Sequence, residues 1–140
     1  MLRKFGVAAL MLAGCAFAVS GVFAADEKTP TIKDCMKFQG KNGLANKVGE
    51  AAKSEKWDDA QKASADLFKL GQAMTKNTPP QNAEKKDAWE KVTKEFCEKT
   101  KAVDDAAKAK KAEDVSKAVT ALLDQKSCGG CHGTFKPAKK

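Results

Sequence analysis

The sequence contains a single histidine, His132, and no stretch with the alternating pattern of a β-strand. A structural zinc site needs four ligands, so one that used His132 would have to recruit Cys35 and Cys97 from far upstream. Without strands, the chain also lacks the βαβ context in which a thioredoxin-type cysteine pair is found. Zinc binding and dithiol redox chemistry are therefore the weaker interpretations of its cysteines.

Long apolar runs are also scarce, and the one that exists spans Phe5 to Val19 behind the charged segment Leu2-Arg3-Lys4. Val22-Phe23-Ala24 follows it and has the small-x-small pattern of a cleavage site. We predict a secretory signal over residues 1–24 and a mature domain over residues 25–140, with no transmembrane segment in the mature chain.

Two alternatives for this segment remain open. A retained membrane anchor is one, although Gly14 and Ser20 interrupt a run that is already short for a membrane span. The other is a lipid anchor, because Leu12-Ala13-Gly14-Cys15 resembles a lipoprotein processing site that would leave Cys15 lipidated. The apolar stretch Ala16 to Ala24 favours cleavage after Ala24, since a lipoprotein normally turns polar after its cysteine. We expect an exported protein located in the periplasm.

The chain is organised around Cys128-Gly129-Gly130-Cys131-His132, close to the end of the sequence. Two cysteines three positions apart, followed directly by histidine, are typical of haem attachment, in which the thiols form thioethers and the imidazole binds iron. On a helix, Cys131 and His132 would share a face with Cys128. We predict one covalent haem c, held by Cys128 and Cys131, with His132 as the proximal axial ligand of the iron.

The chain is basic, with 26 lysine and arginine residues against 18 acidic ones. Without Arg3 and Lys4 of the predicted signal, 24 basic residues face 18 acidic ones, a net charge of +6. Such a charge can steer a redox partner protein with an acidic docking surface, although a solvated lysine surface needs no partner. We expect no nucleic-acid binding, because no nucleic-acid module is recognisable.

Apolar residues recur at helical spacing in four segments of the mature chain. We predict helices from Ile32 to about Ser54, from Trp57 to before Asn77, from about Ala83 to Ala109, and from about Glu113 to the haem attachment motif. Gly40 and Asn42-Gly43 predict a kink or a weak turn in the first helix. Asn77-Thr78-Pro79-Pro80 ends the second helix because proline cannot continue it, and Lys108 to Lys111 forms the next turn.

Each segment has an apolar face that is expected to be buried. These faces are Ile32, Met36, Leu44 and Val48; Trp57, Ala60, Ser64, Leu67, Gly71 and Met74; Trp89, Val92, Phe96, Thr100, Val103 and Ala107; and Val115, Ala118, Val119 and Leu122. Four amphipathic helices with short connections predict an all-α fold, namely an antiparallel four-helix bundle with a C-terminal haem attachment box. We expect Lys136 to Lys140 to be a frayed tail.

The haem motif ends the last of the four predicted helices, and His132-Gly133-Thr134-Phe135-Lys136 is similar to a His-x-x-aromatic-basic ending. Together with Trp57-Asp58-Asp59-Ala60, these features make residues 31–136 resemble the class II c-type cytochromes, the cytochrome c prime and cytochrome c-556 group. Lys136 stands where that family more often has arginine, so bidentate hydrogen bonding is not expected there.

The resemblance implies that a residue on the first helix faces the iron, and Met36 stands at that position. A methionine there closes the sixth coordination site and raises the reduction potential, which suits a one-electron carrier rather than an enzyme. Alternatively, Met36 is one more core methionine, and the protein is a five-coordinate, cytochrome c prime-like protein that binds nitric oxide or carbon monoxide. Met74 is a rival donor, but it is expected in the core. A peroxidase would need a distal acid-base group, and no second histidine exists.

Cys35 and Cys97 are the remaining thiols of the mature chain. An even pair in an oxidising compartment suggests a disulfide, whereas the first and third helices of such a bundle are diagonal neighbours and a disulfide needs Cα atoms within about 7 Å. A disulfide and two buried free thiols both remain open. Pairing of two chains into a homodimer, as many relatives of this class do, also remains open.

Overall fold

The computed structural model describes residues 29–136 of the 140-residue chain. The predicted secretory signal, Cys15 and the last four residues of the predicted tail lie outside the described residues. Within residues 29–136, all regular secondary structure is helical. The all-α prediction is therefore confirmed for this part of the chain, and none of its helices is long and apolar enough to cross a membrane.

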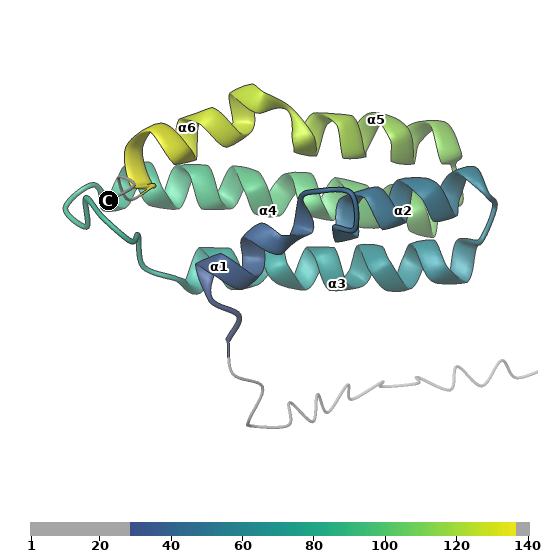
Figure 1. Cartoon of the computed structure of the whole chain (residues 1–140), viewed down its shortest axis with the longest axis horizontal. Helices are drawn as coiled ribbons and strands as arrows, with labels where there is room; N and C mark the ends of the chain where they lie inside the picture. Colours follow the sequence, from purple (N-terminus) through teal and green to yellow (C-terminus); the bar gives the residue numbers. More distant parts are fainter. Residues whose placement is uncertain (1–28, 137–140) are drawn as a thin grey trace, which may run out of the picture.

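The described chain forms six α-helices and one 3-10 turn. They are α1 (Ile32–Cys35), the turn η1 (Met36–Phe38), α2 (Leu44–Lys53), α3 (Trp57–Lys76), α4 (Lys86–Lys108), α5 (Ala112–Leu123) and α6 (Gln125–Phe135). Figure 1 shows α3 and α4 as the two long rods of the molecule, lying side by side and running in opposite directions.

The helices α2 and α4 each pack against both α3 and α5, and these four enclose the larger of two apolar cores. The short α1 lies on α3, while α6 continues beyond α5 along α4 (Figure 1). We call the end with the turns at residues 54–56 and 109–111 the far end. The opposite end, where α1, α6 and the α3–α4 connection at residues 77–85 lie, is the site end.

The second and third predicted helices are confirmed as α3 and α4, with α4 starting three residues later than expected. Their predicted faces are buried at most positions, including Leu67 and Val103, which are fully buried. At Gly71, an added Cβ would lie 2.1 Å from Oγ1 of Thr100 on α4. The glycine therefore lets α3 and α4 approach closely, which explains its place in the predicted apolar face.

The interruption predicted within the first helix is confirmed as a turn, because a loop over residues 39–43 separates η1 from α2 and divides the segment into separate helical pieces. Gly40 has a φ of 92°, a left-handed conformation that favours glycine. An added Cβ at Gly43 would lie 2.2 Å from the backbone oxygen of Phe38. Both glycines thus suit a turn at this point, which is one of the two interruptions that the sequence predicted.

The fourth predicted helix is also two helices. Asp124 has a φ of −59° and a ψ of 129°, which is extended backbone, so the chain leaves the helical path between α5 and α6. No glycine or proline marks this break in the sequence. As a result, the predicted haem attachment motif lies on α6, a helix separate from α5 (Figure 1).

Candidate functional site

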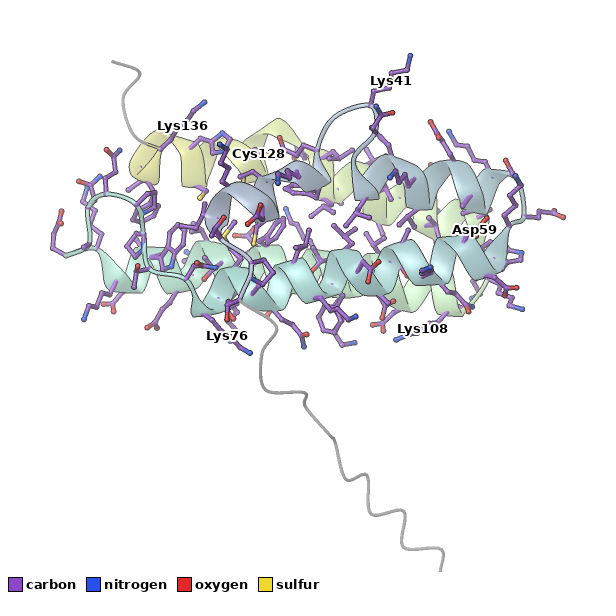
Figure 2. The ribbon with its side chains drawn as sticks, turned by 60° about the horizontal axis from the view of Figure 1, so that its bottom comes forward. Lys41, Asp59, Lys76, Lys108, Cys128 and Lys136 are labelled. Atoms are coloured by element: carbon purple, nitrogen blue, oxygen red, sulfur yellow. The ribbon has the colours of Figure 1, made fainter. Side chains whose placement is uncertain are left out.

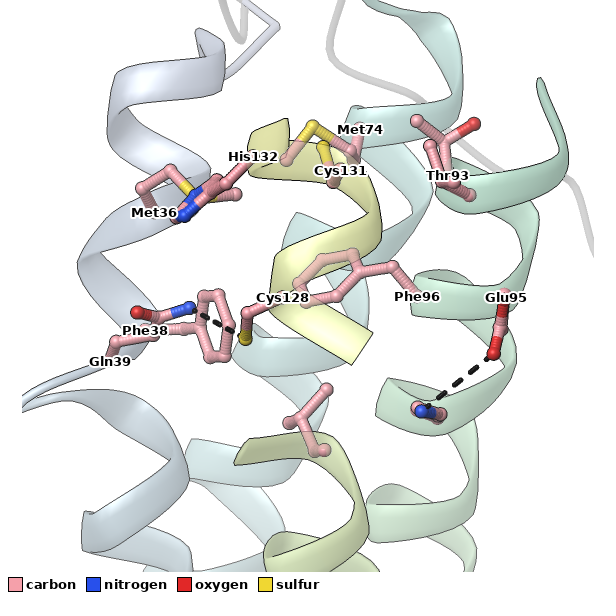
Figure 3. A pocket seen from close by; sticks show the side chains of 13 residues that line it. Met36, Phe38, Gln39, Met74, Thr93, Glu95, Phe96, Cys128, Cys131 and His132 are labelled. Carbon is pink, nitrogen blue, oxygen red and sulfur yellow. Dashed lines mark hydrogen bonds and ion pairs between the residues drawn. The ribbon is translucent and has the colours of Figure 1, made fainter. Parts of the chain in front are cut away.

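The three residues of the predicted haem motif lie together on α6. Cys128, Cys131 and His132 are all half-buried, whereas Gly129 and Gly130 between them are exposed. The motif is therefore helical, as the shared-face prediction requires, and its two thiols and its imidazole lie toward the body of the protein (Figure 3).

Met36 is half-buried at the first position of η1, directly after α1. It lines a small cavity together with Cys128, Cys131 and His132, and it also lines a larger hollow on the outer side together with Cys131 and His132. Residues more than ninety positions apart in the sequence thus meet at one site. Figure 3 shows Met36 and His132 on facing elements at this cavity.

The small cavity has a volume of about 50 Å³ and a mostly apolar wall. Besides the four residues already named, its apolar wall consists of Phe38, Met74, Val92, Phe96 and Leu122. Phe38 and Phe96 contact each other with ring centroids 5.0 Å apart. The wall comes from five helical elements, so the cavity lies where α6 closes over the core.

The outer hollow has a volume of about 440 Å³ and shares Met36, Gln39, Cys131 and His132 with the small cavity. Its remaining apolar lining is Ile32, Pro80, Trp89 and Phe135. Lys33 and Lys136 also line it, from α1 and from the end of α6. The hollow is therefore apolar at its base and carries positive charge at its rim.

The residues at this site fit a covalently held haem. The donor set is the required one, with two thiols three positions apart on one helix, an imidazole beside the second thiol, and a thioether on a facing element. The small cavity alone is below the range of about 300–1,000 Å³ for ligand pockets, whereas the adjoining hollow falls within it. Because both spaces share His132 and Met36, they together provide an apolar site of cofactor size.

Four polar residues at the cavity, Gln39, Thr93, Glu95 and Lys99, were not foreseen from the sequence. Gln39 donates from Nε2 to Sγ of Cys128 at 3.4 Å, and Nζ of Lys99 lies 3.9 Å from Oε1 of Glu95 on the cavity wall. Gln39 could have been found, since it follows Met36 by three residues and such spacing shares a helical face. The spacing of four between Glu95 and Lys99 likewise suits an ion pair on α4.

The segment that carries Met36 is held by its own cap and by a buried thiol. Thr31 and Asp34 form a capping box at the start of α1. Hydrogen bonds from Lys37 and then from Thr31 lower the pKa of the Asp34 carboxyl from 3.8 to about 2. At the other end of α1, Cys35 is fully buried and its Sγ lies 3.6 Å from the backbone oxygen of Leu70 on α3.

The four described thiols are free in this structure. Burial, and then the neighbouring Cys128, raises the pKa of Cys131. Burial, and then the charge of Asp34, raises the pKa of Cys35, and burial followed by Glu98 raises that of Cys97. A raised pKa favours the protonated thiol at Cys35, Cys97 and Cys131. Cys35 and Cys97 are not bonded to each other here, although both approach the same turn of α3, at Leu70 and Gly71.

Met74 was expected to be a core residue remote from the site, and the structure places it both in the core and at the site. It is 2% exposed and packs with Cys35, Trp89 and Phe135 in the smaller apolar core. It also lines the small cavity, so two methionines border the space that His132 faces. Met36 and Met74 must therefore be distinguished by experiment.

Among residues 29–136, no three His, Cys, Asp or Glu side chains are grouped so that they could hold a metal ion directly. A haem does not require such a group, because the porphyrin supplies most of the ligands of its iron.

Comparisons with known proteins do not identify this chain. No family model, no curated protein and no solved structure matches it.

Proposed function

We propose that this protein is a monohaem c-type cytochrome that carries single electrons in the periplasm. The observation that supports this proposal most is the convergence of Cys128, Cys131, His132 and Met36 on one apolar cavity. Cys128 and Cys131 hold the cofactor covalently, while His132 and Met36 are its two axial ligands. Bound there, a haem supplies one-electron oxidation and reduction at its iron.

The fold is consistent with the class II arrangement that the sequence resembles. We propose that α1 with α2 forms the first arm of an antiparallel four-helix bundle, α3 and α4 the second and third, and α5 with α6 the fourth. The pairwise packing of α2, α3, α4 and α5 supports this view. In such a bundle the breaks at residues 39–43 and at Asp124 interrupt the two arms that carry the axial ligands.

The apolar wall has a chemical consequence for this function. Phe38, Val92, Phe96 and Leu122 exclude water from the side of the site that faces the core. Exclusion of water and a thioether ligand both disfavour the more highly charged oxidised state and so raise the reduction potential. A site of this kind suits an electron carrier with no open coordination position.

The proposed partner is a redox protein with an acidic docking surface. Lys33 and Lys136 are exposed and line the outer hollow together with His132. Labelled lysines on other elements, such as Lys41, Lys76 and Lys108, also point outward in Figure 2. A positive rim at the hollow can orient an acidic partner toward the cofactor edge, and this attraction should weaken with added salt.

The visible spectrum of the exported, haem-loaded protein tests the proposal. We expect a low-spin spectrum, a thioether-to-iron charge-transfer band in the oxidised form, and slow or absent carbon monoxide uptake by the reduced form. A protein that is exported without covalent haem would contradict the proposal. The Cys128→Ser and Cys131→Ser variants should each lose one thioether bond, which mass spectrometry and the haem absorbance can report.

The distal ligand is tested by two matched variants. Met36→Ala should remove the charge-transfer band and open the iron to carbon monoxide, because it deletes the thioether. Met74→Ala removes a methionine from the same cavity and should leave the band in place while lowering stability. If Met74→Ala abolishes the band and Met36→Ala does not, the assignment of Met36 is wrong and Met74 is the ligand.

A second candidate function has one observation in its favour. Met36 packs against both apolar cores, as a core methionine would. In that case the distal side is an apolar pocket without a ligand, and the protein binds nitric oxide or carbon monoxide. A high-spin spectrum that shifts promptly under carbon monoxide, and that Met36→Ala leaves unchanged, would favour this candidate.

A further inference from the structure

The α3–α4 connection at residues 77–85 contacts both of the segments that carry the proposed axial ligands. It lies at the site end, next to the start of α1 and the last turn of α6 (Figure 1). The connection contributes Pro80 to the outer hollow but no proposed ligand to the iron. Its hydrogen bonds nevertheless extend from one ligand-bearing segment to the other.

Asn77, the first residue of this connection, makes the contact to the Met36 side. Its Nδ2 donates to the backbone oxygens of Pro30 and Ala73, each at 2.9 Å. Pro30 directly precedes the capping box of α1, which is only four residues long and ends beside Met36. The Asn77 amide therefore fixes the start of the short segment whose other end is held on α3 by Cys35.

Trp89 extends the chain of contacts to the His132 side. Its Nε1 donates to the backbone oxygen of Asn77 at 2.7 Å, and its ring meets Phe135 edge-on with centroids 5.1 Å apart. Trp89 is 4% exposed and Phe135 is 1% exposed, so this contact lies inside the smaller core. Phe135 follows His132 by three residues on α6 and shares its side of the helix.

Two further amides hold the end of α6. Nδ2 of Asn82 donates to the backbone oxygen of Thr134, and Nε2 of Gln81 donates to that of Lys136 at 2.6 Å. The last carbonyl groups of a helix have no partner within the helix, so these bonds satisfy groups that would otherwise need water. The connection thus holds the end of α6, beyond the break in the helical path at Asp124.

We propose that Asn77 and Trp89 are positioning residues that set the separation between Met36 and His132. The proposal rests on the proposed function, in which these two side chains are the axial ligands. Loss of the Asn77 or Trp89 contact should release one ligand-bearing segment from the other. Met36 is the side chain expected to leave, because its segment is a single helical turn, whereas His132 belongs to a helix that also carries the covalent attachment.

Two conservative substitutions in the haem-loaded protein test this proposal. Asn77→Asp keeps the shape of the side chain but removes the Nδ2 donor, and Trp89→Phe keeps a ring near Phe135 but removes the Nε1 donor. One hydrogen bond is worth about a factor of five in a conformational equilibrium. Each variant should therefore raise the fraction of iron without its thioether ligand, and the carbon monoxide association rate, by about fivefold.

Gln61→Leu is the matched control, because Nε2 of Gln61 donates to the backbone oxygen of Ala107 at the far end. It removes a side-chain-to-carbonyl bond of the same kind and should leave the charge-transfer band and the carbon monoxide rate unchanged. A Met36→Ala background supplies a second control. If Asn77→Asp acts by displacing Met36, it should no longer change the carbon monoxide rate once Met36 is absent.

The proposal is overturned if Asn77→Asp and Trp89→Phe lower stability as Gln61→Leu does and leave the band intensity unchanged. A wild-type spectrum without the thioether band would instead refute the proposed axial pair. The positioning proposal would then be decided by amide hydrogen exchange, in which Asn77→Asp should speed exchange in α1 by about fivefold because it removes the contact to Pro30. Unchanged exchange in α1 would refute it.

Discussion

The far end and the site end of this molecule are packed by different kinds of side chain. At the far end, alanines fill the contacts between helices, and Ala45, Ala52, Ala60 and Ala107 are at most 1% exposed. At the site end, the smaller core relies on Met74, Trp89 and Phe135. Small residues let helices approach closely, whereas large side chains span a wider separation. The helices are therefore closely packed at the far end, where the hollows have mostly charged linings, whereas the hollow at the site end has a mostly apolar lining.

The two ends also differ in the partners of their polar side chains. At the far end, the buried carboxylate of Asp104 accepts from Oγ of Ser64 at 2.9 Å and pairs with Lys108 on its own helix. Among the described residues, no buried side-chain nitrogen or oxygen lacks a partner. At the site end, side-chain amides bond mainly to backbone oxygens of other segments, as Asn77 and Gln81 do. The far end is joined by the Ser64–Asp104 bond and one amide tie, from Gln61 to Ala107, whereas the site end has several amide ties between segments.

Phe135→Ala should have the largest effect on stability and should unfold only the site end. Truncation of a buried phenylalanine costs about 3–5 kcal/mol, and here it also removes the contact with Trp89. We expect α6 to detach before the rest of the protein unfolds, because only the site end loses packing. Amide hydrogen exchange should show fast exchange in α6 with protected α3 and α4. Uniform loss of protection in all helices would show that the two ends unfold as one unit.

Leu67→Ala tests the larger core, which α2, α3, α4 and α5 enclose. Leu67 is fully buried on α3, and its truncation should cost about 2–5 kcal/mol of unfolding free energy. Unlike the Phe135 variant, it should lower the midpoint of denaturant unfolding for all helices together. The absorbance of the haem-loaded protein should not change, since Leu67 lines neither the cavity nor the hollow. A changed charge-transfer band would show that the two cores are coupled.

The sequence predicted the long helices well because each has a continuous apolar face and a strong end signal. The prolines at residues 79 and 80 locate the end of α3, and the face from Trp89 to Ala107 locates α4. The breaks between helices were harder to predict. The extended backbone at Asp124 has no glycine or proline beside it, so only the packing of α6 on α4 accounts for it. A buried charge such as Asp104 also escapes a prediction based on apolar spacing.

The sequence predicted the candidate ligands of the site, but it did not predict the side chains that hold the surrounding segments in place. Cys128, Cys131 and His132 are adjacent in sequence, so a motif can identify them, and Met36 was placed by a family resemblance. Gln81 and Asn82 contact the end of α6 from 55 and 52 residues away, respectively. No local spacing encodes contacts of that range. Side-chain amides that tie loops to helices therefore become visible only in the folded chain.

Gly71→Ala should lower stability by less than the two truncations. It tests the close approach of α3 to α4 on the boundary between the two ends. The new Cβ would lie 2.1 Å from Oγ1 of Thr100, and 3.2 Å from the Cα of Cys97. Overpacking of this kind costs about 1–3 kcal/mol, because the helices must separate or Thr100 must change its rotamer. A compensating Thr100→Ala substitution should restore part of the loss in denaturant unfolding. No recovery would show that the backbone near Cys97 causes the strain.

The smallest expected effect comes from the ion pair at the far end. The hydrogen bond and the charge of Asp104 raise the pKa of Lys108 above 10.5. A raised pKa means that the folded state holds this proton more tightly, so the pair stabilises the protein below pH 10.5 and its contribution is lost as the pH rises further. Unfolding measured across this range should show a steeper loss for the wild type than for Lys108→Gln. Because Lys108 is exposed, the difference between the two proteins should be small and should shrink in high salt. The charge-transfer band should be the same in both proteins. Equal slopes of unfolding free energy against pH would show that the ion pair adds nothing to the stability of the far end.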